Sequence, residues 1–366
     1  MTIYETALFI VGFLLGLSLF FKRPSLCHNN GNHDGQSLSV IIPARNEERN
    51  LPGILGDLLQ QTRKAEEIIC VDDGSSDRTA DIARSFGVTV VTVSDKPEGW
   101  TGKSFACQTG ADRARGELLL FLDADVRLTP DALEKLIATR SKNACAVSVQ
   151  PHHRVERPYE QMSLFFNLLM IAANGVCLPF RRRHIGLFGP VILIGQSEYD
   201  RVGGHASVRQ SIADDLALGE RLKAEGLPFK LFLGGKDISF RMYGENFRQL
   251  LQGWTKNFAT GALKTPLALL AAAFWWITAV TAAPLNIVLA ATGGQLVKIL
   301  LFAGIYLAFA LEVAFAVRVA GNFSKLSVLL YPVALSVFFF VFISSLYKKI
   351  LHRSVKWKGR NVALRK

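Results

Sequence analysis

The longest apolar runs of the chain lie near its two ends. The first run, residues 4–21, contains a single acid, Glu5, and ends at two basic residues. Three further runs follow, at residues 266–291, 296–317 and 326–347. Each run is long enough to cross about 30 Å of hydrocarbon as a helix. We therefore expect a transmembrane anchor over residues 1–22 and C-terminal membrane segments over residues 263–347. A signal peptide is the alternative for the first run, but no small-residue cleavage site follows its apolar core.

Between these ends, short apolar runs alternate with helix-like segments. Strands are expected at residues 38–43, 67–72, 88–93 and 117–123, and helices at residues 47–60, from Asp77 and after Gly102. Strands separated by helices of this length form an α/β fold with a mainly parallel sheet. We place this domain at residues 37–262, after a polar linker at residues 23–36. In such sheets, ligands bind at the carboxyl ends of the strands.

The formal net charge of +12 has a local source. The tail over residues 348–366 is rich in Lys and Arg and contains no acid. Basic residues beside a membrane span indicate topology and contact with anionic lipid more often than nucleic-acid binding. We therefore expect the bilayer as a partner and no nucleic acid. The five cysteines include no CxxC pair, which argues against a zinc site or a disulfide framework.

Two carboxylates follow the strand that ends near residue 122. Asp123 and Asp125 are one residue apart and can both face a single divalent cation. Mg²⁺ or Mn²⁺ takes oxygen ligands and commonly binds phosphate oxygens as well. Such an ion would stabilise a diphosphate leaving group. The alternative is that one of these acids only caps a helix near Thr129.

The loop after the second strand is also acidic. Asp72 and Asp73 can accept hydrogen bonds from a base edge or a ribose hydroxyl, and Gly74 permits close approach of the backbone. A turn with capping residues and no ligand is the alternative.

The stretch around Lys103 contains half of a P-loop motif. The full motif needs a glycine five residues before Gly102, and Pro97 stands there, so an NTPase is excluded. Lys103 remains suited to an anionic substrate near a helix start, with a plain surface charge as the alternative.

Taken in order, these segments resemble the motifs of family 2 inverting glycosyltransferases with the GT-A fold. The resemblance covers residues 37–260 and implies a nucleotide-sugar donor, a UDP-sugar, and a Mg²⁺ or Mn²⁺ ion. It assigns metal binding to Asp125, with Asp123 beside it. It assigns donor binding to Pro43, Ala44, Arg45, Glu47, Asp72, Asp73, Lys103 and Asp123.

The same resemblance extends to residues further along the chain. The segment 212–219 is similar to the acidic helix start that supplies the family's general base, a role implied for Asp215 first and Asp214 second. The alternative is a pair of acids favoured by the helix dipole. Trp254 matches a tryptophan that the family places beside donor and acceptor. Leu250 and Gly253 depart from the Gln and Arg of many polymer-extending members, which favours transfer of a single sugar.

The segments 99–104, 240–243, 253–256 and 357–360 resemble those of a narrower branch, the bacterial 4,4'-diaponeurosporenoate glycosyltransferases. This resemblance implies a lipophilic membrane acceptor, a carotenoid acid, and a glycosyl ester as product. Glycosyltransferases for hopanoid, ceramide or diacylglycerol acceptors are the alternatives. The apolar stretch 162–180 is either a buried helix or an interfacial helix beside a lipid acceptor.

Two other classes of protein fit the sequence less well. A nucleotidyltransferase would need a glycine-rich phosphate loop near the first strand, where this chain has Arg45. A catalytically silent membrane scaffold would be expected to lose site acids, yet Asp73, Asp125 and Asp215 are present.

The membrane topology carries a conflict. The catalytic domain is expected on the cytoplasmic face of a multi-pass cell-membrane protein. Three later crossings would then leave the basic tail outside, against the positive-inside rule. One apolar segment is therefore expected to be re-entrant or interfacial.

Overall fold

The computed structural model describes residues 1–27, 35–93, 95–180, 184–211, 213–350, 354–357 and 360–363, without the side chains of residues 256–263 and of those from 348 onward. Residues 28–34, half of the expected linker, and the side chains of the basic tail lie outside the described residues. The chain forms two compact units: a sheet unit, Pro24–His152 and Ile185–Met242, and a helical unit, Met1–Arg23, His153–His184 and Tyr243–Lys366. Compact units need not coincide with domains, so the expected limits at residues 37 and 262 remain a prediction.

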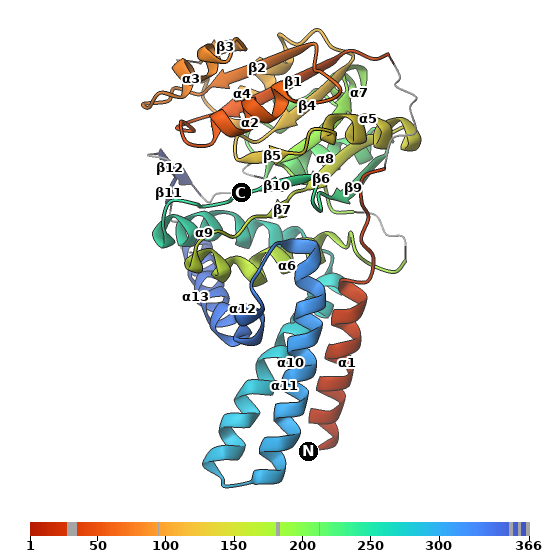
Figure 1. The fold of residues 1–366 in the computed structure, drawn as a ribbon, viewed down its shortest axis with the longest axis vertical. Coiled ribbons are helices and arrows are strands. Elements are labelled where there is room, and N and C mark those ends of the chain that lie inside the picture. Colours follow the sequence, from red (N-terminus) through yellow and green to blue (C-terminus); the bar gives the residue numbers. More distant parts are fainter. Residues whose placement is uncertain are drawn as a thin grey trace. The chain divides into compact units, whose positions relative to one another are not determined.

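A seven-stranded sheet with the order β3-β2-β1-β4-β8-β6-β9 forms the centre of the sheet unit (Figure 1). Its strands are β1 (Leu38–Ala44), β2 (Glu67–Asp72), β3 (Thr89–Thr92), β4 (Leu118–Leu122), β6 (Ala146–Gln150), β8 (Val191–Gly195) and β9 (Phe229–Leu233). The strand β1 is parallel to β2 and β4, whereas β8 is antiparallel to both of its neighbours. The expected α/β fold with a mainly parallel sheet is confirmed.

The helices of the sheet unit connect these strands. They are α2 (Leu51–Leu59), α3 (Thr79–Ser85), α4 (Gly102–Ala111), α5 (Ala132–Asn143), α7 (Gln196–Arg201), the 3-10 turn η2 (His205–Val208) and α8 (Asp214–Ala224). The first helix begins four residues later than expected. The backbone N–H groups of Glu47 and Glu48 donate to the side chains of Thr79 (2.8 Å) and Asp77 (3.1 Å), which hold this stretch as a loop.

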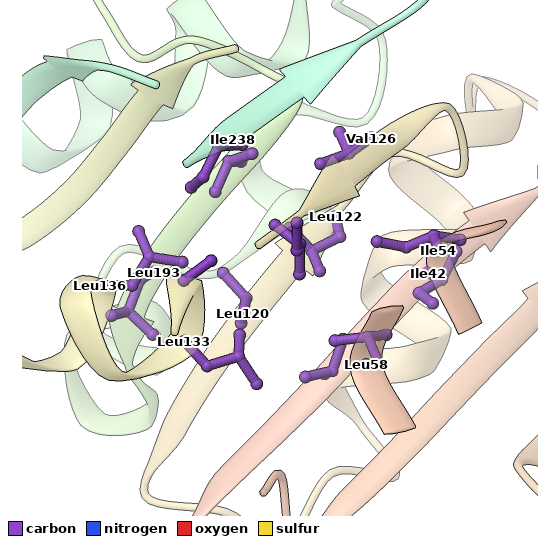
Figure 2. Packing of buried hydrophobic residues seen from close by; sticks show 14 of the residues in the cluster. Ile42, Ile54, Leu58, Leu120, Leu122, Val126, Leu133, Leu136, Leu193 and Ile238 are labelled. Atoms are coloured by element: carbon purple, nitrogen blue, oxygen red, sulfur yellow. The ribbon is translucent and has the colours of Figure 1, made fainter. Parts of the chain in front are cut away.

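The core of the sheet unit lies between the sheet and its helices. Ile42 of β1, Ile54 of α2, Leu120 of β4, Leu136 of α5 and Leu193 of β8 are all fully buried there (Figure 2). All five residues of β4 are buried, which explains its uninterrupted apolar sequence, because a central strand is covered on both faces.

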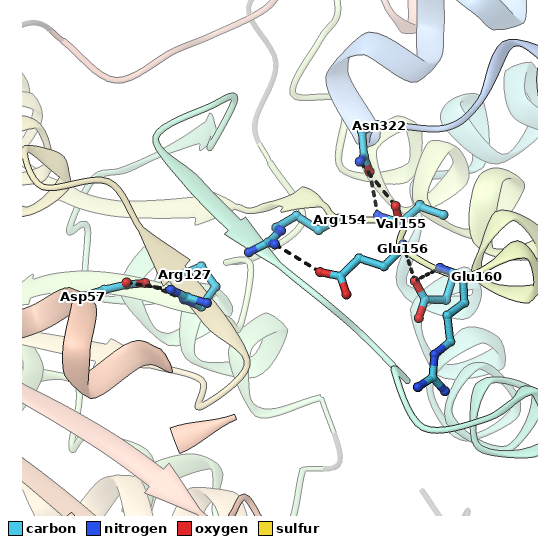
Figure 3. A network of polar contacts seen from close by, with 8 residues as sticks. Asp57, Arg127, Arg154, Val155, Glu156, Glu160 and Asn322 are labelled. Carbon is cyan, nitrogen blue, oxygen red and sulfur yellow. Dashed lines mark hydrogen bonds and ion pairs between the residues drawn. The ribbon is translucent and has the colours of Figure 1, made fainter. Parts of the chain in front are cut away.

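A second sheet of three short strands has the order β5-β10-β7, with β5 at Val126–Leu128, β10 at Ile238–Phe240 and β7 at His152–His153. Arg127 of β5 makes a two-pronged ion pair with Asp57 of α2, at 2.6 and 2.8 Å (Figure 3). Such paired hydrogen bonds are stronger and more directional than single ones. They fix the loop that follows β4 against α2.

Among its described residues, the helical unit has two helices that are long and apolar enough to cross a membrane. They are α10 (Leu267–Thr292) and α11 (Leu296–Ala320), with mean hydropathies of 1.7 and 2.3. The N-terminal apolar run is a shorter helix, α1 (Ile3–Leu19). The remaining elements are η1 (Pro158–Ser163), α6 (Leu164–Asn174), α9 (Phe247–Lys264), α12 (Lys325–Leu329), α13 (Tyr331–Ile350), β11 (Ser354–Trp357) and β12 (Arg360–Ala363). The expected third span at residues 326–347 is therefore divided between two helices.

Close packing holds α1 against α10 and α11. Gly12 and Gly16 of α1 have no room for a side chain: a Cβ at Gly12 would overlap Ala279, and one at Gly16 would overlap Trp276 and Glu312. The indole of Trp276 also donates to the buried Glu312 carboxylate at 3.0 Å. Small residues at such positions let helices approach closely in lipid.

The start of η1 is fixed by hydrogen bonds within the helical unit. The amide oxygen of Asn322 accepts from the Val155 N–H at 2.6 Å, and the Glu160 carboxylate accepts from the N–H groups of Glu156 (2.6 Å) and Arg157 (3.1 Å) (Figure 3). The Asn322 bond ties Val155 to the segment that follows α11, and the Glu160 bonds fix the first turn of η1.

Candidate active site

The carboxyl ends of β1, β2 and β4 lie side by side at one edge of the sheet. Ala44 at the end of β1 is in register with Asp72 at the end of β2, and Ile41 pairs with Phe121 near the end of β4. The structure therefore brings together most of the predicted donor-binding residues at this edge. They are Pro43, Ala44, Arg45, Glu47, Asp72, Asp73 and Asp123.

The acidic loop after β2 is packed against the loop after β1. Asp72 accepts a hydrogen bond from the Ser75 N–H at 3.1 Å, so its carboxylate stabilises the turn. Arg45 donates to the Asp73 carbonyl at 2.5 Å and lies 3.9 Å from the Asp73 carboxylate. Gly74 has φ +63°, a left-handed conformation that glycine adopts without strain. Asp72 thus stabilises the turn, and its role at the donor stays a prediction, while Arg45 and Asp73 bring two charged groups to the sheet edge.

Lys103 lies among the carboxylates of this edge. Thr101 caps α4 by accepting from the Ser104 N–H at 3.3 Å, which places Lys103 in the first turn of the helix. The Lys103 ammonium is 2.5 Å from the Asp123 carboxylate and 3.4 Å from the Gly189 carbonyl. Burial by itself would lower the pKa of Lys103, but the carboxylates of Asp123 and Asp214 outweigh it and raise the pKa. Lys103 is therefore a fixed positive charge.

Two adjacent acids begin α8 and have different surroundings. Asp214 is buried and accepts a hydrogen bond from the Ser104 hydroxyl at 3.2 Å. Asp215 accepts from the N–H of Leu216 at 2.8 Å. Burial, together with the charge of Asp214, raises the pKa of Asp215 to about 6. One acid is thus held by a side-chain hydrogen bond, and the other has the pKa of a proton acceptor near neutral pH.

These groups line one small pocket at the edge of the sheet. Its lining consists of Pro43, Lys103, Cys107, Phe121, Leu122, Asp123, Gly189, Ile192, His205, Asp214 and Asp215. The sequence alone did not point to Cys107, Gly189 or His205. His205 is fully buried with Nδ1 2.8 Å from the Tyr199 hydroxyl, and burial lowers its pKa to about 4, so it is neutral.

The two predicted metal ligands follow β4 but do not form a complete metal site. Asp123 is already paired with Lys103, and Asp125 is half-buried. Over the described ranges, no three His, Cys, Asp or Glu side chains are grouped closely enough to hold an ion. Two carboxylates fit Mg²⁺ or Mn²⁺ only if phosphate oxygens and water complete the coordination. The residues present therefore fit an ion that arrives with a diphosphate.

Trp254 belongs to the helical unit and is buried there. Its indole N–H donates to the Ser163 hydroxyl at 3.2 Å, and its ring stacks on Phe166 with centroids 4.8 Å apart. Tyr243 packs edge-on against it.

The stretch that contains Phe166, expected as an interfacial or a buried helix, is α6, and nearly all of its residues are buried. This burial favours the buried-helix alternative.

Comparison with known proteins shows which family this chain belongs to. The family model described as glycosyl transferase family 2 matches residues 39–217. A 4,4'-diaponeurosporenoate glycosyltransferase of Staphylococcus aureus strain USA300 is 34% identical over 367 residues, which cover 99% of this chain and 97% of the relative. The chain belongs to glycosyl transferase family 2.

Two solved structures are similar to this chain in fold. One is a mannosyltransferase of Pyrobaculum calidifontis in complex with GDP-Man and Mn²⁺; it is 18% identical, with a TM-score of 0.49, over 87% of this chain and 96% of that one. The other is a glucosyl-3-phosphoglycerate synthase of Mycobacterium tuberculosis with Mn²⁺ and UDP-glucose; it is 17% identical, with a TM-score of 0.44, over 65% of this chain and 87% of that one.

Family membership confirms several predictions from the sequence. The chain is a glycosyltransferase that uses a nucleotide-sugar donor, with the GT-A fold. The resemblance to the carotenoid-acid branch is confirmed by the near full-length relative. The roles of individual site residues remain predictions.

Proposed function

We propose that this enzyme transfers one sugar from a UDP-sugar, with inversion, to a carotenoid acid embedded in the membrane. The observation that carries the proposal is the pocket in which Lys103 neutralises Asp123 while Asp215 lies nearby with a raised pKa. The relative that is 34% identical over nearly the whole chain supports the acceptor class. Hopanoid, ceramide and diacylglycerol acceptors are the alternatives.

The donor would bind along the sheet edge. Arg45 and Asp73 are positioned for the nucleoside, beside the turn that Asp72 stabilises. Lys103 and Asp123 are positioned for the diphosphate, where the ammonium would pair with phosphate oxygens. Asp125, with Asp123, would hold a Mg²⁺ or Mn²⁺ ion, which when bound supplies positive charge to the leaving diphosphate.

The acceptor oxygen would attack the anomeric carbon from the face opposite the diphosphate. A new C–O bond forms while the bond from the anomeric carbon to the diphosphate oxygen breaks, and its electron pair leaves with the diphosphate. Lys103 stabilises the negative charge that develops there. If the acceptor is a hydroxyl, its proton passes to Asp215, whose raised pKa suits a base near neutral pH. A carboxylate acceptor is already ionised and gives up no proton.

The long apolar helices of the helical unit support a lipophilic acceptor. The helices α10 and α11 are long and apolar enough to cross a bilayer. Leucines on their surfaces are exposed, including Leu289 and Leu311 at 67% and 73%. In a membrane, such side chains would face acyl chains. Because nucleotide sugars are made in the cytoplasm, we place the sheet unit on that side of the cell membrane.

The acceptor proposal is tested by comparing two acids that share the same reactive group. The purified full-length chain in liposomes receives UDP-glucose, Mn²⁺ and either a long carotenoid acid or a short soluble carboxylic acid. We expect the carotenoid acid to gain the mass of one hexose and the short acid to react far more slowly, because it lacks the binding energy of the apolar chain. Equal rates for the two acids would contradict a membrane-embedded acceptor. Transfer only to an added hopanoid, ceramide or diacylglycerol would show that this lipid, and not the carotenoid acid, is the acceptor.

A further inference from the structure

The last apolar segment of the helical unit is bent into two helices. The helices α12 and α13 meet at Leu330, inside a stretch that is apolar from Leu326 to Tyr347. The apolar segment Tyr331–Tyr347 of α13 is 17 residues long, as is α1, so the depth that its ends reach, and not its length, decides whether it crosses a bilayer.

Hydrogen bonds show how far along α10 and α11 the turn between α12 and α13 lies. The Tyr331 hydroxyl donates to the Val280 carbonyl at 3.0 Å, and its ring stacks on Tyr306 with centroids 5.0 Å apart. The Tyr306 hydroxyl in turn donates to the carbonyl of Leu329. Val280 and Tyr306 lie near the middle of α10 and α11. The turn therefore lies about half-way along these two helices.

Both ends of this hairpin lie at one end of the helical bundle. Ser324, before α12, donates its N–H to the Gln161 side chain at 3.1 Å and follows directly on the C-terminal end of α11. Ser345, late in α13, donates to the Thr255 carbonyl of α9 at 2.7 Å, and α9 leads into the N-terminal end of α10. Figure 1 shows α12 and α13 beside the upper part of α10 and α11, well away from the loop that joins those two helices.

The hairpin has an apolar outer surface. One stripe of α13, with Leu335, Phe338 and Val341, is buried within the unit. The opposite stripe is also apolar but exposed, with Phe340 and Ile343 at 64% and 63%. Its other members are Val333, Leu346 and Tyr347. The exposed sides of α10 and α11 are apolar as well, so one occupant, the acyl chains of a bilayer, covers all three helices.

The distribution of charged side chains indicates which end of the helical bundle faces the cytoplasm. Among the described residues, the end of the bundle where the hairpin begins carries a group of exposed basic side chains. They are Lys22, Arg23, Arg318 and Lys325. The opposite end, around Met1 and the α10–α11 loop, carries Lys298 with the acid Glu5. Basic residues beside membrane helices favour the cytoplasmic side.

We propose that α12 and α13 form a re-entrant hairpin that enters only the cytoplasmic leaflet. The helices α1, α10 and α11 then cross the membrane, with Met1 and the α10–α11 loop outside. Both ends of the hairpin and the basic tail lie on the cytoplasmic side. This arrangement removes the topological conflict of four crossings. It rests on the helical unit alone and does not depend on which sugar or acceptor is used.

The topology is tested with single cysteines in a full-length background whose half-buried Cys27 is replaced by serine. Thr2→Cys, Thr292→Cys, Lys236→Cys, Leu330→Cys and Arg365→Cys are labelled with a membrane-impermeant maleimide in intact and permeabilised cells. We expect positions 2 and 292 to react in intact cells, and positions 236 and 365 only after permeabilisation. Position 330 should react poorly in both, because it lies in hydrocarbon.

Two results would overturn the proposal. Labelling of position 365 in intact cells would mean that α13 crosses the membrane. Labelling of position 2 only after permeabilisation would mean that α1 does not cross. A second readout is available if Leu330→Cys fails to accumulate: Phe340→Cys, on the exposed stripe, should react with a lipid-soluble maleimide and not with the impermeant one. Reaction with the impermeant reagent after permeabilisation would place that stripe in water.

Discussion

The Lys103 ammonium lies 2.5 Å from the Asp123 carboxylate, although the two residues come from α4 and from the turn after β4. This ion pair connects the helix that follows β3 to the edge where the diphosphate is proposed to bind. Because Asp123 and Asp214 together raise the pKa of Lys103, the lysine stays charged over the whole working range of pH.

Removing this charge should slow transfer. Lys103→Met leaves Asp123 without its counter-ion and takes one positive charge from the leaving diphosphate, so we expect turnover to fall by about 10²–10³-fold. Lys103→Arg should restore part of the loss. The measurement is sugar transfer with UDP affinity followed by calorimetry. Lys236→Met, at an exposed position, is the control and should leave both unchanged. Normal turnover in Lys103→Met would exclude a role at the diphosphate.

Ser104 and Asp214 are expected to act as positioning residues. Ser104→Ala removes the 3.2 Å hydrogen bond to Asp214 and leaves that buried carboxylate with one partner fewer. A hydrogen bond to a charged group contributes about 1.5–3 kcal/mol, so stability should fall in that range. Asp214→Asn can still accept from Ser104 and should be milder. Thermal unfolding and transfer rates measure both effects, and a larger loss of turnover in Asp214→Asn than in Asp215→Asn would reverse the two acids' roles.

The pH dependence follows from the raised pKa of Asp215. A base must be ionised to accept a proton, so kcat/KM with a hydroxyl acceptor should fall as the pH drops below about 6. Above that pH the carboxylate is ionised and the rate should level off. With a carboxylate acceptor the same fall should be weaker, because no proton is removed. A profile that is identical for both acceptors would exclude Asp215 as the base.

Removing the proposed metal ligand should affect the ion more than the fold. Asp125→Asn exchanges a charged oxygen ligand for a neutral one, so transfer at ordinary Mn²⁺ concentration should be lost while the protein still folds and inserts. A Mn²⁺ titration of activity, with circular dichroism as the control for folding, measures this. Full activity of Asp125→Asn without added Mn²⁺ would contradict the assignment.

Much of the fold could be predicted because β4 is covered on both faces and therefore has an unbroken apolar sequence. The acids after it lie at the sheet edge for the same topological reason. The ion pair between Lys103 and Asp123 could not be predicted, since it depends on how α4 packs against the sheet. No sequence motif indicated that His205 would line the pocket. The turn at Leu330 could not be predicted from hydropathy, because both α12 and α13 are apolar. Pro332, at the second position of α13, is nevertheless a common helix-start signal.

The most direct test of the central claim is the transfer rate of Asp215→Asn beside that of the wild-type chain. Both purified proteins receive radiolabelled UDP-glucose, Mn²⁺ and a hydroxyl-bearing lipid acceptor in liposomes, and UDP affinity is measured in parallel. If the sheet-edge pocket is the active site and Asp215 is the base for a hydroxyl acceptor, the variant should be slower by about 10²–10⁴-fold with unchanged UDP affinity. Equal rates for the two proteins would contradict the claim.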